Sequence, residues 1–256
     1  MARRFRVAKL ECAAYRIMSM NILAFDTCFD ACSVCVARAD GDGGITELAS
    51  VSERFATGHA EKLIPFVDDS MRRAGVAFAD IDRIAVTIGP GTFTGTRIGI
   101  AAARGLAVAT QIEIVSTTSL AVMAEVAAGA FGRSGLDRDL AIAVDARRDQ
   151  VYVQLFGTGG LDPKSPPMLL SIDEASRVGG DGPLIIAGSA AETTAAAATQ
   201  RGREVSANFA DLLPEATALA LMAPALPVVE GALVPLYLRP PDAKPQDGKA
   251  IARAEP

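Results

Sequence analysis

Two stretches of the sequence share one order of elements: an apolar strand that ends in an aspartate, a short turn and a second strand. The first stretch covers residues 21–37 (NILAFD, TCFD, ACSVCVA), and the second covers residues 140–156 (LAIAVD, ARRD, QVYVQLF). Apolar runs of this length bounded by turn residues predict strands, and each pair predicts a hairpin. Because a repeated unit indicates repeated architecture, we predict two lobes of the same ancestry.

Between these hairpins the periodicity changes from strand to helix and back. Residues 45–51 predict a third strand, and residues 60–71 carry apolar side chains at helical spacing. The segments that follow predict a buried strand, an alanine-rich helix, a short strand and another helix: Ile81–Gly89, Thr96–Thr110, Ile112–Val115 and Ser119–Ala128. This order is that of an RNase-H-like lobe and not of a plain Rossmann half. The predicted fold class is therefore α/β.

Composition shifts suggest where the domains begin and end. The polar segment Gly129–Asp139 reads as a linker, and residues 1–19 carry five basic residues and one acid directly before the strand that starts at Met20. We expect that first segment to be disordered or to precede the true start. The predicted domains are an N-terminal extension, two lobes and a disordered tail: 1–19, 20–128, 129–243 and 244–256.

The glycine-rich turn Gly89–Gly95 (GPGTFTG) joins a buried strand to a helix N-terminus. Unpaired backbone N–H groups and the helix dipole at such a point suit an anion. It is no P-loop, because no lysine follows and the glycine spacing differs. The pattern alone leaves a phosphate contact and a purely structural tight turn equally open. The predicted nucleotide-like or phosphate-like site comprises Asp26, Thr27, Gly89, Gly91, Thr92, Thr94 and Gly95.

Asp26 and Asp145 end the first strands of the two hairpins. In two-lobed ATPase folds such acids orient magnesium and water around phosphates. An acid that only caps the neighbouring turn is the alternative. For Asp26 both interpretations stay open, and for Asp145 the cap is favoured.

Histidine and cysteine usage restricts the chemistry. The chain has one histidine, His59, so a metal site with two histidines is excluded within one chain, and we predict no metal; a surface or capping role is expected for this side chain. Cys28, Cys32 and Cys35 have the C-x₃-C-x₂-C spacing of iron–sulfur radical enzymes. In an alternating strand, however, Cys32 and Cys35 should point to opposite faces, so we expect buried packing residues.

Charge and hydropathy bear on location and partners. The net charge of −5 argues against broad contact with nucleic-acid backbones by this chain alone. Residues 216–238 are apolar enough to suggest a membrane, but prolines, a glycine and Glu230 interrupt them, which favours a buried helix followed by an extended tail. We expect a cytoplasmic protein with no membrane contact.

The two predicted helices of the first lobe suggest a partner interface. The apolar stripe on residues 60–71 is most simply core, but it also suits half of a helix–helix interface, and small residues on the second helix permit close packing. Arg97 and Arg104 lie seven residues apart and so share a helix face. The predicted interface comprises Ala60, Ile64, Val67, Met71, Gly99 and Ala102.

Several segments together resemble the TsaB (YeaZ) family in order and spacing. They are MNILAFDTCFDACSVCV, GHAEKLIPFVDD, IAVTIGPGTFTGTRIGIAAARGLA, VDARRDQVY and PLYLRPPDA, which extend from Met20 to about Ala243. The departures are mild: Cys28 stands where serine is usual, Thr92 replaces the commoner serine, and Thr96 replaces leucine.

The resemblance implies an actin/hexokinase-like fold and a non-catalytic subunit of the complex that makes N6-threonylcarbamoyladenosine at position 37 of ANN-decoding tRNAs. It implies TsaD and TsaE as partners, a homodimer when alone, tRNA contact only through the complex, and no cofactor beyond weak ATP or ADP binding. The paralogue TsaD carries its metal on histidines after the glycine turn, whereas residues 115–125 here contain none. The alternatives are a stand-alone ATP-dependent or glycoprotease-like enzyme and the iron–sulfur radical enzyme.

Overall fold

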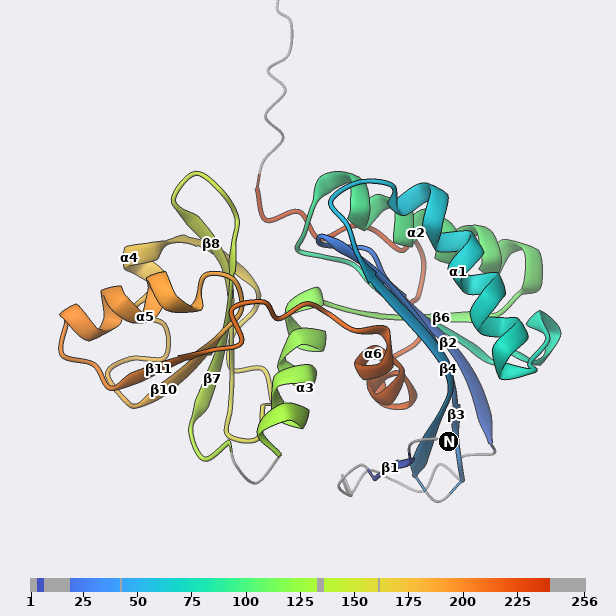
Figure 1. Cartoon of the computed structure of the whole chain (residues 1–256), viewed down its shortest axis with the longest axis horizontal. Coiled ribbons are helices and arrows are strands. Elements are labelled where there is room, and N and C mark those ends of the chain that lie inside the picture. The colour runs from blue at the N-terminus through green and yellow to red at the C-terminus, as the bar shows by residue number, and fades with distance from the viewer. Residues whose placement is uncertain (1–3, 7–18, 42, 133–135, 161, 240–256) are drawn as a thin grey trace, which may run out of the picture.

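The computed structural model describes residues 4–6, 19–41, 43–132, 136–160 and 162–239. In this part of the chain the strands form two mixed sheets, which lie side by side with helices between and outside them (Figure 1). The order of strands in the first sheet is β1-β4-β3-β2-β5-β6, and in the second it is β11-β10-β7-β8-β9.

The first lobe is built on the first predicted hairpin. Its strands are β2 (Met20–Asp26), β3 (Ala31–Ala39), β4 (Gly44–Arg54), β5 (Arg83–Thr87) and β6 (Glu113–Thr117). The first three are antiparallel, while β5 and β6 run parallel to β2. Helices α1 (His59–Ala74) and α2 (Phe93–Thr110) cover one face of this sheet, and the short η1 (Phe78–Asp80) precedes β5.

The second lobe repeats this topology. Its strands are β7 (Asp139–Asp145), β8 (Gln150–Phe156), β9 (Met168–Ser171), β10 (Leu184–Ala187) and β11 (Val205–Asn208). Here β7, β8 and β9 are antiparallel, and β10 and β11 are parallel to β7. Helices α4 (Ile172–Ala175) and α5 (Ala191–Gln200) follow β9 and β10. Since β9-β8-β7-β10-β11 matches β4-β3-β2-β5-β6, the predicted two-lobed α/β fold with RNase-H-like lobes is confirmed.

The last helix of each repeat packs against the sheet of the other lobe. Helix α3 (Ser119–Phe131) follows the first sheet, yet its Leu120 and Met123 are fully buried in a cluster with Leu140 and Phe156 of the second sheet. Helix α6 (Ala216–Met222) follows the second sheet, yet Leu219 is buried with residues of β2, β3 and β5. Packing therefore does not follow the predicted boundary between residues 128 and 129.

The chain after α6 returns along the first lobe. After η3 (Ala223–Ala225), residues 226–239 form an extended segment, here called the C-terminal strap. The Val229 N–H donates to the Ile114 carbonyl at 2.8 Å, and the Leu236 N–H donates to the Ile88 carbonyl at 2.8 Å. The predicted buried helix followed by an extended tail is thus confirmed. No helix in the described ranges is both long and apolar enough to cross a bilayer.

Parts of the two predicted terminal segments lie outside the described residues. Within the predicted extension, Arg4–Arg6 form β1, which pairs antiparallel with Gly44–Thr46 at the start of β4. Residues 1–3, 7–18 and the whole of 244–256 lie outside the described residues.

The exchange of helices predicts that α6 stabilises the first lobe. Replacing the fully buried Leu219 with alanine should lower the free energy of unfolding by roughly 2–5 kcal/mol, because a cavity opens between α6 and the sheet. Chemical denaturation measures this, and hydrogen exchange should show the lost protection in β2 and β3. Val108→Ala is the control, since that side chain is 76% exposed. Equal stabilities of the two variants would contradict the packing described.

Candidate functional site

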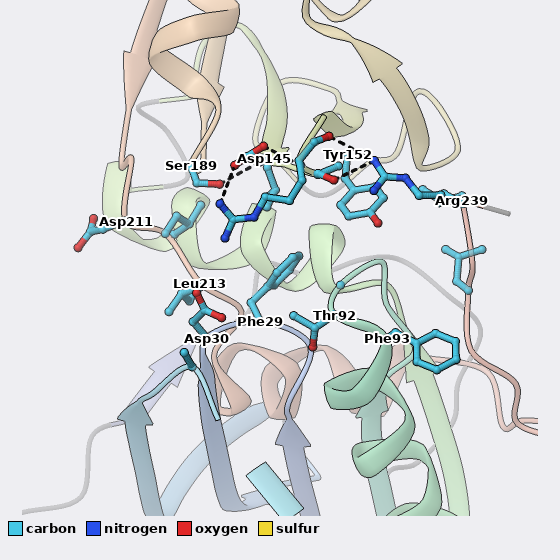
Figure 2. Close-up of a pocket in the computed structure, with 18 of the residues that line it drawn as sticks. Phe29, Asp30, Thr92, Phe93, Asp145, Tyr152, Ser189, Asp211, Leu213 and Arg239 are labelled. Carbon is cyan, nitrogen blue, oxygen red and sulfur yellow. Dashed lines mark hydrogen bonds and ion pairs between the residues drawn. The ribbon is translucent and has the colours of Figure 1, made fainter. Parts of the chain in front are cut away.

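A cleft of about 1110 Å³ separates the two lobes. Figure 2 shows Phe29, Asp30, Thr92 and Phe93 on the side of the first lobe, opposite Asp145, Tyr152 and Ser189 from the second. Both hairpin turns and the turns after β5 and β10 lie at this cleft, as the repeat of one topology requires. It is therefore the candidate functional site.

The glycine turn packs tightly against the β2–β3 turn. A Cβ atom on Gly91 would lie 2.3 Å from the carbonyl oxygen of Cys28, and one on Gly95 would lie 2.0 Å from that of Thr27. No side chain fits at such distances, so glycine is required for the two backbones to approach. The glycines here thus serve backbone-to-backbone contact within the protein.

The backbone N–H groups of Thr92 and Gly95 in this turn have partners within the protein. The Thr92 N–H donates to the Cys28 carbonyl at 2.7 Å, and the Thr96 N–H donates to the Thr92 carbonyl at 3.1 Å. Thr92 caps α2 by accepting the Gly95 N–H at 3.1 Å. The Thr27 hydroxyl donates to the Gly95 carbonyl at 2.7 Å. The close backbone contacts at Gly91 and Gly95, together with these hydrogen bonds, favour the tight structural turn over the phosphate cradle.

The predicted site residues separate into two groups. Gly91 and Thr92 line the cleft, and Thr94 is exposed in the first turn of α2. The remaining four are buried beneath the turn: Asp26, Thr27, Gly89 and Gly95. The structure brings the set together, but most of it faces the protein interior.

Asp26 is an interior group. Its carboxylate accepts hydrogen bonds from the Thr87 hydroxyl and, at 3.1 Å, from the Cys28 N–H. Burial raises the pKa of the Asp26 carboxyl from 3.8 to about 6, although these hydrogen bonds act in the opposite direction. Of the two interpretations left open, the arrangement favours an acid that caps its own turn.

Asp145 occupies the same place in the second hairpin but faces the cleft. Its side chain is 47% exposed, and its Oδ1 accepts the Arg147 N–H at 2.8 Å. The Asp145 N–H donates to the Ser189 hydroxyl at 3.0 Å, which joins the turns after β7 and β10. The predicted site contains none of Asp145, Arg147 and Ser189, although the repeat of the hairpin is a signal for this region.

His59 is buried, so the expected surface role is wrong. Its Nε2 donates to the Phe29 carbonyl at 2.8 Å, and its ring packs edge-on to Phe55 at 4.9 Å between centroids. The first residue of α1 is thereby tied to the β2–β3 turn. A hydrogen bond across 30 residues has no local sequence signal.

The cysteines pack as expected. Cys32 lies in the core cluster beneath α1 and α2, while Cys35 lies in the cluster beneath α6, on the opposite face of the sheet. Burial raises the pKa of each of these two thiols to about 12, and that of the Cys28 thiol well above its usual range. The three sulfurs cannot converge on one cluster as thiolates, so the iron–sulfur interpretation is wrong.

The predicted interface residues do not form one surface. Val67 and Met71 belong to the core, and Gly99 is buried against Thr27 and Val86. Ala102 is half-buried, whereas Ala60 and Ile64 are exposed. The reason is that α1 turns one side, with Leu63, Val67 and Met71, onto the sheet. We define the α1–α2 face by five exposed small or apolar residues of these adjacent helices, which also carry exposed charged residues: Ala60, Ile64, Ala101, Gly105 and Val108.

Two glycines of α2 give opposite predictions. Gly95→Ala should lower the free energy of unfolding by roughly 1–3 kcal/mol, because the new methyl group would force α2 away from Thr27. Gly105→Ala should raise it by about 0.5–1 kcal/mol, since a Cβ there meets nothing within 4 Å and alanine favours helix. Thermal or chemical denaturation distinguishes the two. A tolerated Gly95→Ala would show that the close approach is not required.

The Asp26 pKa predicts a pH-dependent stability. Between pH 3.8 and about 6 the folded state holds a proton that the unfolded state releases, so the Asp26 contribution to stability falls as pH rises. Asp26→Asn lacks this loss, so relative to the native protein it should gain roughly 1–3 kcal/mol between about pH 4 and pH 8. Denaturant unfolding of both proteins at each pH measures the difference between their stabilities, in which the contributions of the other acidic residues cancel. A stability difference independent of pH would refute the assignment.

Comparison with known proteins places the chain in a family. Residues 50–220, about two thirds of the chain, match the family model described as TsaD, tRNA N6-adenosine threonylcarbamoyltransferase. The tRNA threonylcarbamoyladenosine biosynthesis protein TsaB of Escherichia coli is 38% identical over 133 residues, and its Bacillus subtilis counterpart is 33% identical over 137. These matches cover 52% and 54% of this chain, and the chain spans about half of each relative, 53% and 55%.

Solved structures agree with these matches over a longer stretch. The structure of YeaZ from Pseudomonas aeruginosa is 30% identical, with a TM-score of 0.68, and the match covers 86% of this chain and 100% of that one. A second structure from the same organism, described as having similarity to peptidase YeaZ, gives a TM-score of 0.69 at 30% identity, again covering 86% of this chain and 100% of that one. The two-lobed fold is thus that of known relatives, and the chain belongs to the TsaB (YeaZ) family.

Proposed function

We propose that this protein is the non-catalytic subunit of the complex that transfers the threonylcarbamoyl group to adenosine 37 of ANN-decoding tRNAs, where it binds and activates TsaD. The observation that carries the proposal is the α1–α2 face. A family whose curated members are named for tRNA threonylcarbamoyladenosine biosynthesis supplies the pathway. In this proposal TsaE joins the complex, tRNA contacts this chain only through the complex, and the protein acts in the cytoplasm.

The α1–α2 face has the character of a protein interface. Ile64 is 51% exposed and Val108 is 76% exposed, on two adjacent helices that cover the outer side of the first sheet (Figure 1). On α2, Ala101 and Gly105 are also exposed, and their small size allows another backbone to approach closely. Exposed apolar side chains on two adjacent helices favour a partner. The same face would pair two copies of the chain when TsaD is absent.

The positions from which catalysis would be expected support a non-catalytic role. Asp26 and His59 are both buried, and each forms a hydrogen bond to a partner inside the first lobe. The glycine turn packs against the β2–β3 turn, and its Thr92 N–H donates to the Cys28 carbonyl there. In the proposal no resident cofactor is needed, and ATP or ADP would bind the cleft only weakly. The match to the TsaD model supports a paralogue that kept the fold of the transferase.

A stand-alone ATP-dependent or glycoprotease-like enzyme is the rival function. The cleft favours it to the extent that Asp145 and Ser189 face a space of about 1110 Å³. This rival predicts that the purified chain turns over ATP or cleaves a peptide, and that Asp145→Asn abolishes the activity. The proposed subunit shows neither activity by itself.

Charge placed on the α1–α2 face should abolish the complex. Ile64→Asp and Ala101→Asp each put a carboxylate at an exposed position, so the fold is kept while a buried contact with TsaD would be lost. The expected result is failure to co-purify with TsaD and loss of threonylcarbamoyladenosine in a reconstitution with TsaD, TsaE and tRNA. Val67→Asp is unsuitable, because Val67 is a core residue.

Ala196→Asp is the matched control. It makes the same substitution at an exposed position in the interior of α5, in the second lobe. This variant should bind TsaD and support modification as the native chain does. Retention of a tight complex by Ile64→Asp and Ala101→Asp would eliminate this face as the interface. Full modification with the chain omitted would refute the proposed function.

A further inference from the structure

The C-terminal strap contacts both lobes at the mouth of the cleft within four residues. Leu236 donates its N–H to Ile88 at the end of the first lobe's β5 strand. Three residues later the Arg239 guanidinium donates to the Ala146 carbonyl and to Gln150 Oε1, each at 2.9 Å, and to the Arg147 carbonyl at 3.3 Å. Two of these acceptors belong to the β7–β8 turn of the second lobe, and the third is the first residue of β8; Figure 2 shows Arg239 on the side of the cleft where Asp145 and Tyr152 lie.

The turn that Arg239 holds has an unusual backbone. Arg147, Arg148 and Asp149 have φ values of 64°, 57° and 56°, so three consecutive residues other than glycine lie in the left-handed region. Each such residue is disfavoured by contact between Cβ and the backbone, and surrounding structure must hold it there. Charge-assisted hydrogen bonds from Arg239 to the Ala146 carbonyl, just before this run, and to the Arg147 carbonyl, at its start, provide such support.

Tyr237, two residues before Arg239 in the strap, contacts the N-terminal end of α2. The Tyr237 hydroxyl accepts a hydrogen bond from Arg97 Nε at 2.5 Å, and the Tyr237 ring stacks on Phe93 at 5.5 Å between centroids. The Arg97 guanidinium lies 3.4 Å from the centroid of the Phe93 ring. Phe93 is 56% exposed and Tyr237 is 45% exposed, so this cluster lies at the surface, at the N-terminal end of α2.

We propose that the strap couples α2 to the inter-lobe cleft: Tyr237 follows α2, and Arg239 sets the conformation of the β7–β8 turn. A displacement of Arg97 or Phe93 moves Tyr237. Because Arg239 is only two residues further along the strap, the same displacement alters its hydrogen bonds to the β7–β8 turn, which follows Asp145 and carries Arg147. Occupation of the α1–α2 face then changes the cleft. That last step rests on the proposed function, while the coupling within the isolated chain does not.

The coupling in the isolated chain is tested by amide hydrogen exchange of residues 146–150 in three arginine variants. Arg239→Gln removes the charged donor and should speed exchange there by about tenfold or more, because hydrogen bonds from charged groups are the stronger kind. Arg97→Gln, on α2, should speed exchange at the same residues by a smaller factor. Arg104→Gln is the control, seven residues further along α2, and should leave them unchanged. Unchanged protection of β2 and β5 verifies the fold.

Addition of TsaD extends the test. In the native chain TsaD should change exchange at residues 146–150, and in Arg239→Gln it should bind without changing it. The coupling is overturned if Arg97→Gln leaves the turn at native exchange rates, or if bound TsaD has no effect on the turn. If TsaD does not bind the native chain, the proposed function fails. The Arg97→Gln comparison alone then decides whether the strap couples α2 to the β7–β8 turn.

Discussion

The exchange of α3 and α6 between the lobes is the contact on which the rest of the structure depends. A sheet with two apolar faces needs cover on both, and α1 and α2 cover only one face of the first sheet. The other face is covered by α6, which comes from the second repeat, and the second sheet receives α3 in return. Neither repeat can bury its sheet alone, so the two lobes stabilise one another. The cleft between the hairpin turns follows from that arrangement.

Within this frame the two hairpin turns have different roles. In the first lobe Asp26 is enclosed by Thr87 and by the glycine turn, and His59 closes the same region from α1. In the second lobe Asp145 stays open to the cleft, beside a turn whose left-handed backbone is supported from outside by Arg239. One topology thus provides a rigid packed turn on one side and a supported turn on the other. Under the proposed function, rigidity beneath α2 would matter more than an open phosphate cradle.

Helix α2 connects these parts. Its first turn is held against the β2–β3 turn by the glycines at 91 and 95, and its outer side carries exposed Ala101, Gly105 and Val108. Its N-terminal side chains also contact the strap through Tyr237. The glycine turn therefore positions the helix that carries the α1–α2 face, and the strap contacts both that helix and the β7–β8 turn at the cleft. Under the proposed function, the motif would serve this packing and not chemistry.

The sequence by itself determined the two hairpins, the order of strands and helices, the apolar helix followed by an extended strap, and the opposite orientation of Cys32 and Cys35. All of these follow from periodicities of two and 3.6 residues and from turn residues, which act over short distances. Only the tertiary structure decided that Val67 is core while Ile64 is exposed, that α3 and α6 change lobes, and that Asp26 is buried while Asp145 is not. The periodic stripe shows that a helix has an apolar side but not where its edge lies. Burial, and with it the pKa of Asp26, depends on Thr87 and other groups 60 or more residues away, whose proximity no local pattern encodes.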